Sequence, residues 1–283
     1  MPGGASAHET YDQPEDWRGL LAGRPRPDAE ASIFAIADVA DSGSRPFLGL
    51  STDGRQFWVK YQGNLHGVDA LVSERVVASL AAKIGAPMRK SVLVDVPEPL
   101  VGDPRLVGSG IRAGVAHGSP LLDDCTEKEV LDSVAKDHNR FRQPRFIALW
   151  ELFLGADGQW LYDHANDHQV WSFDHGFWTN GGEPSAMSGS DYQNLVHTWS
   201  DWPGSVRGMD SGTFLETAAQ LEALSVFDLI DVVSGVPVAW RIPDENLECL
   251  AWWLHARKPH IADRMRALAN QASNSGKKQR RAR

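Results

Sequence analysis

The chain has 283 residues, of which 42% are hydrophobic and 23% charged, as in a globular protein with its own core. Its net charge of −9 argues against non-specific nucleic-acid binding by the body of the chain, and no apolar run approaches the roughly 18 residues of a membrane span. Cys125 and Cys249 are too few for a disulfide framework, so we expect a cytoplasmic protein. Eleven tryptophans stand against only four tyrosines.

The two ends of the chain differ in composition from its middle. Residues 1–30 are rich in Gly, Pro, Ala and charge, which predicts a disordered arm, with Trp17, Leu20 and Leu21 as a candidate docking spot. Residues 271–283 carry five cations and predict a basic, disordered tail. A contact of this tail with nucleic acid is the alternative interpretation.

Strand signals dominate residues 31–119. A helix interrupts them, because apolar residues recur at spacings of three and four over 68–84 until Gly85 and Pro87 end the run. The Asp53-Gly54 pair predicts a hairpin turn. The predicted strands cover 33–40, 47–51, 56–61 and 91–96.

Helix signals dominate residues 120–270. A small β-rich N-lobe at 31–119, followed by a larger helical C-lobe, predicts an α+β fold of two lobes with a cleft between them. Helices are predicted from the capping boxes at 126–129 and 213–216, over 146–154, and over 247–254 before Pro259.

The predicted strand at 56–61 places Lys60 on the same face as Trp58. Glu74 lies on the second turn of the predicted helix, beside its buried stripe. A lysine held by a glutamate presents a cation to phosphate oxygens. The alternative is a solvated lysine on an outer face.

A turn of small residues joins the first two predicted strands. Its backbone amides and hydroxyls are suited to contacting a phosphate, although most such turns are only connections. The residues concerned are Ser42, Gly43, Ser44 and Arg45.

The segment 155–176 carries most of the candidate chemistry, and it is predicted to form two short strands around a turn at 164–167. If Asp163 pairs with His168, Asp157 faces Asp174 at the open end, with Cα atoms roughly 4.5–5.5 Å apart. Two carboxylates at that separation can serve as a base and a Mg²⁺ ligand. The alternative is a pair of solvated loop carboxylates.

These motifs together resemble the HipA-like kinase domain, a bacterial branch of the atypical protein-kinase fold, over about residues 31–270. The resemblance implies a two-lobed kinase-like fold, ATP and Mg²⁺ as cofactors, and phosphate transfer to a protein serine or threonine. Because some relatives are toxins, it also implies an antitoxin or another regulatory partner. The matching segments are 42–46, 51–54, 58–64, 71–75, 80–85, 114–119, 157–159 and 174–177.

The resemblance also implies roles for single residues. The turn from Ser42 to Arg45 would cover the ATP phosphates, and Lys60, held by Glu74, would bind them. The link between the lobes, near the adenine, would consist of Val115, Ala116 and His117.

In the C-lobe the resemblance makes Asp157 the catalytic base and Asp174 the Mg²⁺ ligand. Kinases place an asparagine five residues after the base, and Tyr162 stands there instead. Asp163 and Asn166 are the candidate replacements, as a second metal ligand.

Two other functions remain open. A pseudokinase or interaction module would bind a nucleotide or a partner without transferring phosphate. A metal-dependent hydrolase would use the dense ligand types Asp163, His164, Asp167, His168, Asp174 and His175. Of the other histidines, we interpret His117 as a packing residue and His66 as a loop residue near the cleft.

Overall fold

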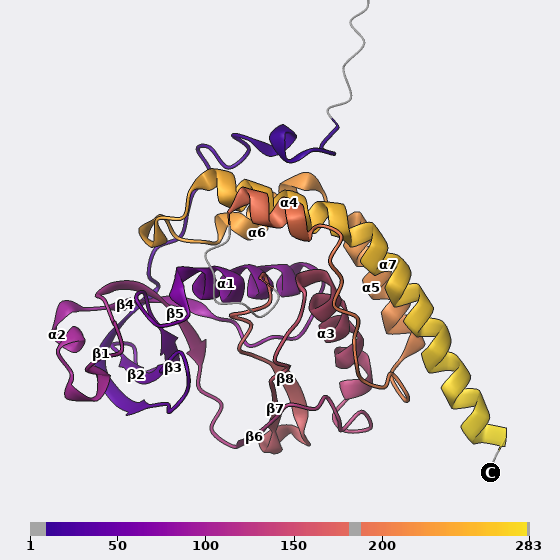
Figure 1. Ribbon diagram of the computed structural model, residues 1–283. Helices are drawn as coiled ribbons and strands as arrows, with labels where there is room; N and C mark the ends of the chain where they lie inside the picture. Colours follow the sequence, from indigo (N-terminus) through magenta and orange to yellow (C-terminus); the bar gives the residue numbers. More distant parts are fainter. Residues whose placement is uncertain (1–9, 181–187, 282–283) are drawn as a thin grey trace, which may run out of the picture.

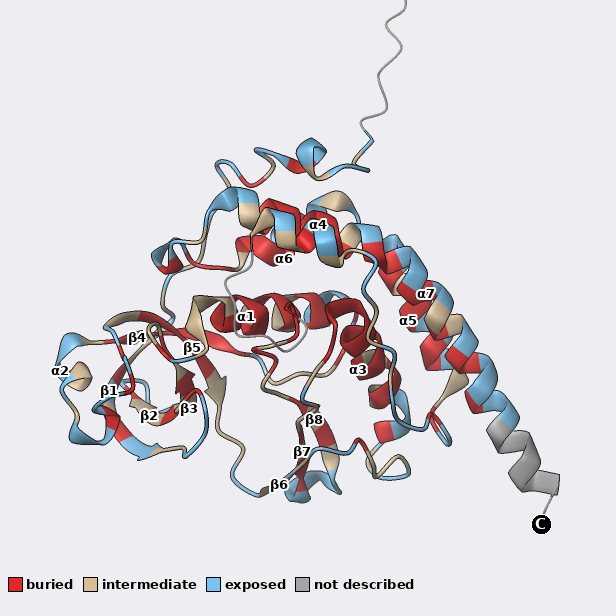
Figure 2. Ribbon diagram, in the orientation of Figure 1, coloured by how far each residue is buried: buried red, intermediate tan, exposed pale blue. Residues whose placement is uncertain are grey.

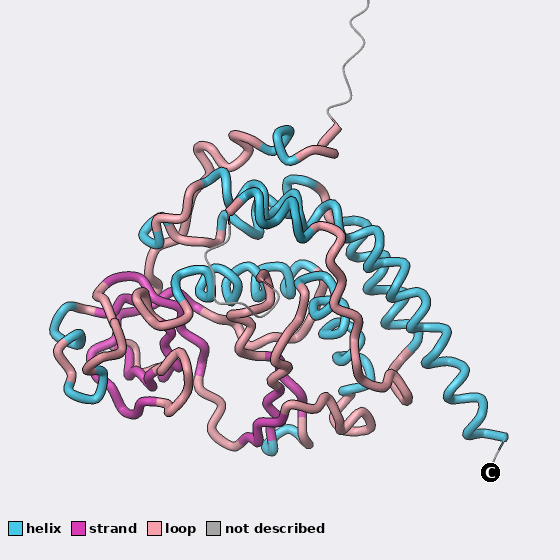
Figure 3. The backbone as a smooth tube through the Cα atoms, in the orientation of Figure 1, coloured by secondary structure: helices cyan, strands magenta, loops and turns pink. Residues whose placement is uncertain are grey.

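The computed structural model describes residues 10–180 and 188–281, and the fold is shown in Figure 1. It mixes α and β structure, as expected, with a closed five-stranded barrel followed by a three-stranded sheet and a set of helices (Figure 3). Within the described ranges, no helix has both the length and the apolar character needed to cross a membrane.

The barrel contains the four strands predicted from the sequence, with boundaries that differ by up to two residues. Its core is apolar and includes Ile33, Phe47, Phe57 and Val59, all almost fully buried. The hairpin turn is confirmed, and Gly54 has the positive φ that such a turn requires. In spatial order the strands are β1 (Ala31–Val39), β2 (Phe47–Ser51), β3 (Gln56–Lys60), β5 (Gly114–Pro120) and β4 (Val92–Val96).

The predicted helix between the third and fourth strands is α1 (Gly67–Lys83). It packs against the barrel strand β5 and against helices of the C-terminal half, so it lies between the two parts of the molecule (Figure 1). Gly85 follows it with a φ of +64°, which ends the helix where the sequence predicted.

Helices dominate the C-terminal half, and the longest, α7, runs along one side of the molecule (Figure 1). Two predictions are corrected here. Thr213 lies inside its helix, whose N-cap is Asp210, and α7 continues through Pro259 instead of ending before it. The helices are α3 (Asn139–Phe153), α4 (Gly189–Leu195), α5 (Ser211–Ala223), α6 (Val226–Ser234) and α7 (Asp244–Arg281).

A three-stranded sheet lies below the helices. The predicted hairpin is present as β7 (Trp160–Asp163) and β8 (Gln169–Ser172). The capping box at 126–129 does not open a helix, because this segment forms β6 (Cys125–Lys128) and pairs with β7. The short elements are α2 (Glu98–Val101) and the 3-10 turns Pro14–Trp17, Pro104–Leu106, His164–Asn166 and Val238–Trp240.

The described part of the N-terminal arm is ordered, which corrects the prediction of a disordered arm for residues 10–30. Trp17 and Leu21, two residues of the predicted docking spot, are buried. Figure 2 shows this segment beside helices of the C-terminal half, where its 3-10 turn contacts α7. At the other end, the α7 backbone remains helical through most of the predicted disordered tail, to Arg281. Residues 1–9 and 282–283 lie outside the described residues.

Candidate functional site

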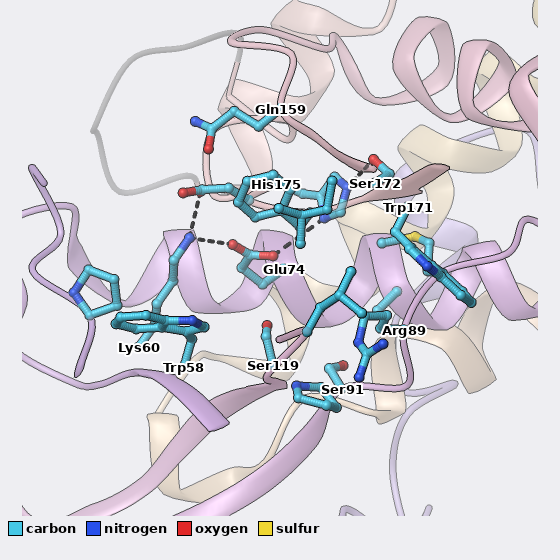
Figure 4. A pocket seen from close by; sticks show the side chains of 18 of the residues that line it. Trp58, Lys60, Glu74, Arg89, Ser91, Ser119, Gln159, Trp171, Ser172 and His175 are labelled. Atoms are coloured by element: carbon cyan, nitrogen blue, oxygen red, sulfur yellow. Dashed lines mark hydrogen bonds and ion pairs between the residues drawn. The ribbon is translucent and has the colours of Figure 1, made fainter. Parts of the chain in front are cut away.

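A cavity of about 450 Å³ lies between the barrel, α1 and the β6–β7–β8 sheet. The barrel supplies Trp58 and Lys60, α1 supplies Glu74, and the segment after β8 supplies Asp174 and His175 (Figure 4). Apolar side chains line much of the remaining wall: Ala78, Met88, Leu122 and Leu161. The cavity therefore joins one charged cluster to an apolar space large enough for a small molecule.

Lys60 occupies the centre of the charged cluster. Its Nζ lies 2.6 Å from Oε1 of Glu74 and 2.5 Å from Oδ1 of Asp174. Burial lowers the pKa of Lys60, but the charges of the two carboxylates outweigh it, and the pKa is raised. The same lysine holds the pKa of Glu74 well below its ordinary range, against the effect of burial. Residues from three separate elements thus meet as a stable ion triad.

His175 contacts this triad through Glu74, as the dashed lines in Figure 4 show. Its Nδ1 lies 3.4 Å from Oε2 of Glu74, and its Nε2 is 2.7 Å from the hydroxyl of Ser172. Ser73 on α1 donates to the carbonyl of His175 at 2.5 Å. These contacts join the segment after β8 to α1, so the position of Asp174 is coupled to that of Glu74.

Asp157 lies in the loop after α3, is exposed, and has a φ of +53°. Tryptophans position this loop: the indole of Trp178 donates to the Ala156 carbonyl at 3.0 Å, and a Cβ on Gly155 would overlap the ring of Trp150. Two of the eleven tryptophans thus pack against this loop and support it.

The predicted register of the β7–β8 hairpin is wrong by one residue. Asp163 pairs with Gln169, not with His168, and the ladder ends at Trp160 and Ser172. Asp157 and Asp174 therefore do not face each other as a ladder pair. Both lie outside the strands and at the same end of the hairpin.

Asp163 and Asn166 are not brought to Asp174. They lie at the opposite end of the hairpin, about 10 Å along the strands. Asp163 accepts hydrogen bonds from the Ala165 amide at 3.0 Å and from the Asn166 side chain at 2.8 Å, so it caps the turn. Tyr162 is buried, and its hydroxyl donates to the Val130 carbonyl at 3.0 Å.

The turn after β1 is only partly directed at the cavity. Ser42 lines it, and Ser44 is buried. Arg45 points elsewhere, because its guanidinium donates to the carbonyls of Arg105 at 2.9 Å and Val107 at 3.3 Å. Of the four predicted residues, only Ser42 lines the cavity, and Arg45 is directed away from it.

The expected link at 115–117 is an interior barrel strand. Val115 and Ala116 are buried within β5 and do not line the cavity. His117 does line it, and burial lowers its pKa to about 4. The segment that leaves the barrel beside the cavity comes slightly later, at Pro120 and Leu122.

Several polar residues of the cavity were not predicted as site residues, among them Gln159 and Glu127. The Nε2 of Gln159 donates to Oδ2 of Asp157 at 2.9 Å, which connects that exposed aspartate to the cavity. Burial raises the pKa of Glu127, and the nearby charges of Asp174 and Asp157 raise it further. The available signal was the position of Gln159, two residues after Asp157 and immediately before β7.

The dense ligand types of the β7–β8 hairpin do not form a metal centre. Among residues 10–180 and 188–281, no group of three His, Cys, Asp or Glu side chains could hold a metal ion. Both ring nitrogens of His164 already have partners, Asp124 at 3.1 Å and Thr126 at 2.8 Å. The hydrolase interpretation therefore lacks its ligand set.

Comparison with known proteins gives one family match. The model of the HipA-like kinase family matches residues 33–141, which confirms the resemblance seen in the sequence. No curated protein matches the chain significantly.

Two solved structures are distantly similar. One is the crystal structure of the Golgi casein kinase with Mn/ADP bound, at a TM-score of 0.43 and 12% identity, over 89% of this chain and 76% of that one. The other, a crystal structure of the Golgi casein kinase, has a TM-score of 0.40 and 10% identity, over 94% and 78%. Likeness at this level says nothing about the function of this chain.

Proposed function

From the match of residues 33–141 to the HipA-like kinase family, we propose that the chain is a two-lobed, kinase-like phosphotransferase. It transfers the γ-phosphate of ATP to a serine or threonine hydroxyl of a protein. The observation that carries this proposal is the triad of Lys60, Glu74 and Asp174, since it supplies a fixed cation and a carboxylate to a phosphate-sized ligand.

The cavity offers both kinds of surface that a nucleotide needs. Trp58 and Leu161 supply apolar faces for a base, and Lys60 supplies the charge for the phosphates. Ser42, in the turn after β1, adds a hydroxyl to the cavity wall. The protein acceptor would approach from outside, where Asp157 is exposed.

The donor types beside the triad fit a divalent cation that arrives with the nucleotide. Mg²⁺ is commonly held by one or two carboxylates together with substrate phosphates, and this requires no preformed three-residue centre. Asp174 and the carboxamide oxygen of Gln159 are the groups that would hold it. When bound, the ion neutralises phosphate charge.

Asp157 performs the proton transfer. The acceptor hydroxyl oxygen forms a bond to the γ-phosphorus while the bond from that phosphorus to the ADP oxygen breaks. The hydroxyl proton passes to a carboxylate oxygen of Asp157, and ADP leaves with the bonding pair. The 2.9 Å hydrogen bond from Gln159 orients that carboxylate.

One observation favours the alternative of a nucleotide-binding pseudokinase or interaction module. Tyr162, which occupies the position expected for a second metal ligand, is buried in the sheet and cannot serve the cavity. If Gln159 does not compensate, the chain would bind nucleotide without transferring phosphate, and an antitoxin or regulatory partner would be its target.

The proposal is tested by γ-labelled ATP with Mg²⁺, comparing the wild type with Asp157→Asn and Asp174→Asn. We expect ATP turnover to fall about 100-fold or more in both variants, because each loses a group that acts in the transfer. Asp163→Asn is the matched control, since it caps the far end of the same hairpin and should retain activity. Undiminished turnover in both test variants would overturn the assignment, whereas nucleotide binding without any turnover would select the pseudokinase.

A further inference from the structure

His66, which precedes α1, lies where three segments of the proposed site meet. Its ring packs against that of Phe177, three residues after Asp174, at an interplanar angle of 48° with centroids 4.6 Å apart. Its Nε2 lies 2.8 Å from where a Cβ on Gly43 would stand, so a side chain at position 43 would force the imidazole to move. The imidazole is half-buried, so part of it remains accessible to a ligand.

The ring nitrogens of His66 have no hydrogen-bond partner in the part of the chain that the structure describes, although the backbone amide of His66 donates to Asn64 at 2.8 Å. Burial lowers the pKa of His66; the charge of Lys60 lowers it as well, and that of Asp174 raises it. The imidazole is therefore within electrostatic range of two members of the ion triad, Lys60 and Asp174. A ring held this close to the triad by packing alone has donor capacity that no protein group uses.

The surroundings of His66 suit an anion. His66 is the N-cap of a 17-residue helix, and its side chain makes no capping hydrogen bond. The first backbone N–H groups of such a helix carry partial positive charge, and Lys60 adds a full one. Ser42, next to Gly43, lines the cavity, so phosphates that extend from Lys60 toward this loop would approach the imidazole.

We propose that His66 donates a hydrogen bond to the terminal phosphate of a nucleotide bound in the cleft, and that it thereby distinguishes a nucleoside triphosphate from a diphosphate. This inference rests on the proposed function. His66 then has a binding role at the mouth of the cavity, while Lys60 holds the phosphates nearer the base. If the ring of His66 served only for packing, its contacts with Phe177 and Gly43 would be sufficient. A phenylalanine at position 66 would also provide those contacts.

Calorimetric titration with ADP and with a non-hydrolysable ATP analogue, both with Mg²⁺, separates these roles. His66→Phe keeps an aromatic ring against Phe177 but removes the donor. We expect it to weaken binding of the ATP analogue about tenfold, the usual effect of losing one hydrogen bond to a charged group, and to leave ADP binding unchanged. His66→Asn, which retains a donor, should recover part of the loss.

His260→Phe is the matched control, because His260 also packs against an aromatic ring, with its centroid 3.8 Å from that of Trp199, and lies outside the cavity lining. It should leave both affinities unchanged. Equal weakening of ADP and the ATP analogue by His66→Phe, or no change in either, would overturn the role of His66 alone. A wild type that binds neither nucleotide would overturn the proposed function itself, so the two failures are distinguishable.

Discussion

Glu74 illustrates how the site is held in place by its own charges. Its side chain is only 5% exposed, and a buried carboxylate is costly unless it is fully paired. One oxygen contacts Lys60 and the other faces His175, so both are satisfied. The lysine is therefore positioned before any ligand arrives, which is the preorganisation that phosphate binding requires.

His117 should make stability depend on pH. It is almost fully buried on β5, opposite Lys60, and burial lowers its pKa to about 4 from 6.5. Between these two pH values, His117 is protonated in the unfolded chain but not in the folded chain. The free energy of unfolding therefore falls as the pH falls from about 6.5 to 4, and His117 accounts for about 3 kcal/mol of that fall in total.

Urea unfolding at pH 8 and pH 5 measures this effect. His117→Gln should lose about 2 kcal/mol less than the wild type between the two pH values, because most of the protonation of an unfolded histidine is complete at pH 5. An identical loss in both proteins would show that His117 titrates normally in the folded state.

At the scale of single elements, local patterns predicted the β2–β3 hairpin and α1 well. Asp53-Gly54 is sufficient to define a tight turn, and a helix with one apolar side and a terminal Gly85 needs no information from elsewhere. The pairing of Lys60 with Glu74 followed from these two elements. The ion pair between Lys60 and Asp174 could not be predicted in this way, because it depends on how the C-terminal half packs against the barrel.

The errors occurred where distant segments decide the outcome. The β7–β8 register shifted because a 3-10 turn at His164–Asn166 is followed by Asp167 and His168 with positive φ, a longer connection than a simple turn. A shift of one residue changes which side chains oppose each other. Likewise, the segment with the capping-box pattern at 126–129 forms a strand and not a helix, because it pairs with β7. Gln159 was overlooked because only the assembled cavity distinguishes it.

Pro259 gives a prediction at this scale. It is exposed within α7, where a proline lacks the N–H that the helix would use and costs about 3 kcal/mol. Packing of α7 against α5 and α6 offsets that cost. We expect Pro259→Ala to raise the free energy of unfolding by about 2 kcal/mol, after allowing for the greater freedom of the unfolded chain.

Pro104 provides the matched control for this change. It is also exposed, but it begins a 3-10 turn, where a proline loses no hydrogen bond. Pro104→Ala should therefore lower the free energy of unfolding slightly, by up to about 1 kcal/mol. If urea titration shows that Pro259→Ala lowers the free energy of unfolding, as Pro104→Ala should, the strain assigned to Pro259 is absent.

Over the whole molecule, the N-terminal segment connects the start of the chain to its last helix. Glu248 on α7 accepts hydrogen bonds from the amides of Gly19 at 3.0 Å and Leu21 at 2.8 Å. Trp252, also on α7, donates to the Asp12 carbonyl at 2.9 Å. Composition alone could not reveal this, because a Gly- and Pro-rich segment is ordered here by contacts made more than 200 residues away.

Trp17 is the centre of that contact and is fully buried, with its ring 5.4 Å from that of His255 on α7. Because α7 also packs against α5 and α6, loss of the anchor should weaken the whole helical half and not only the segment. We expect Trp17→Ala to lower the free energy of unfolding by about 3 kcal/mol in a single urea transition. Glu15→Ala, on the same turn but exposed, should change it by less than about 0.5 kcal/mol. An unchanged midpoint for Trp17→Ala would mean that the segment detaches independently, and that the core of the molecule begins only at β1.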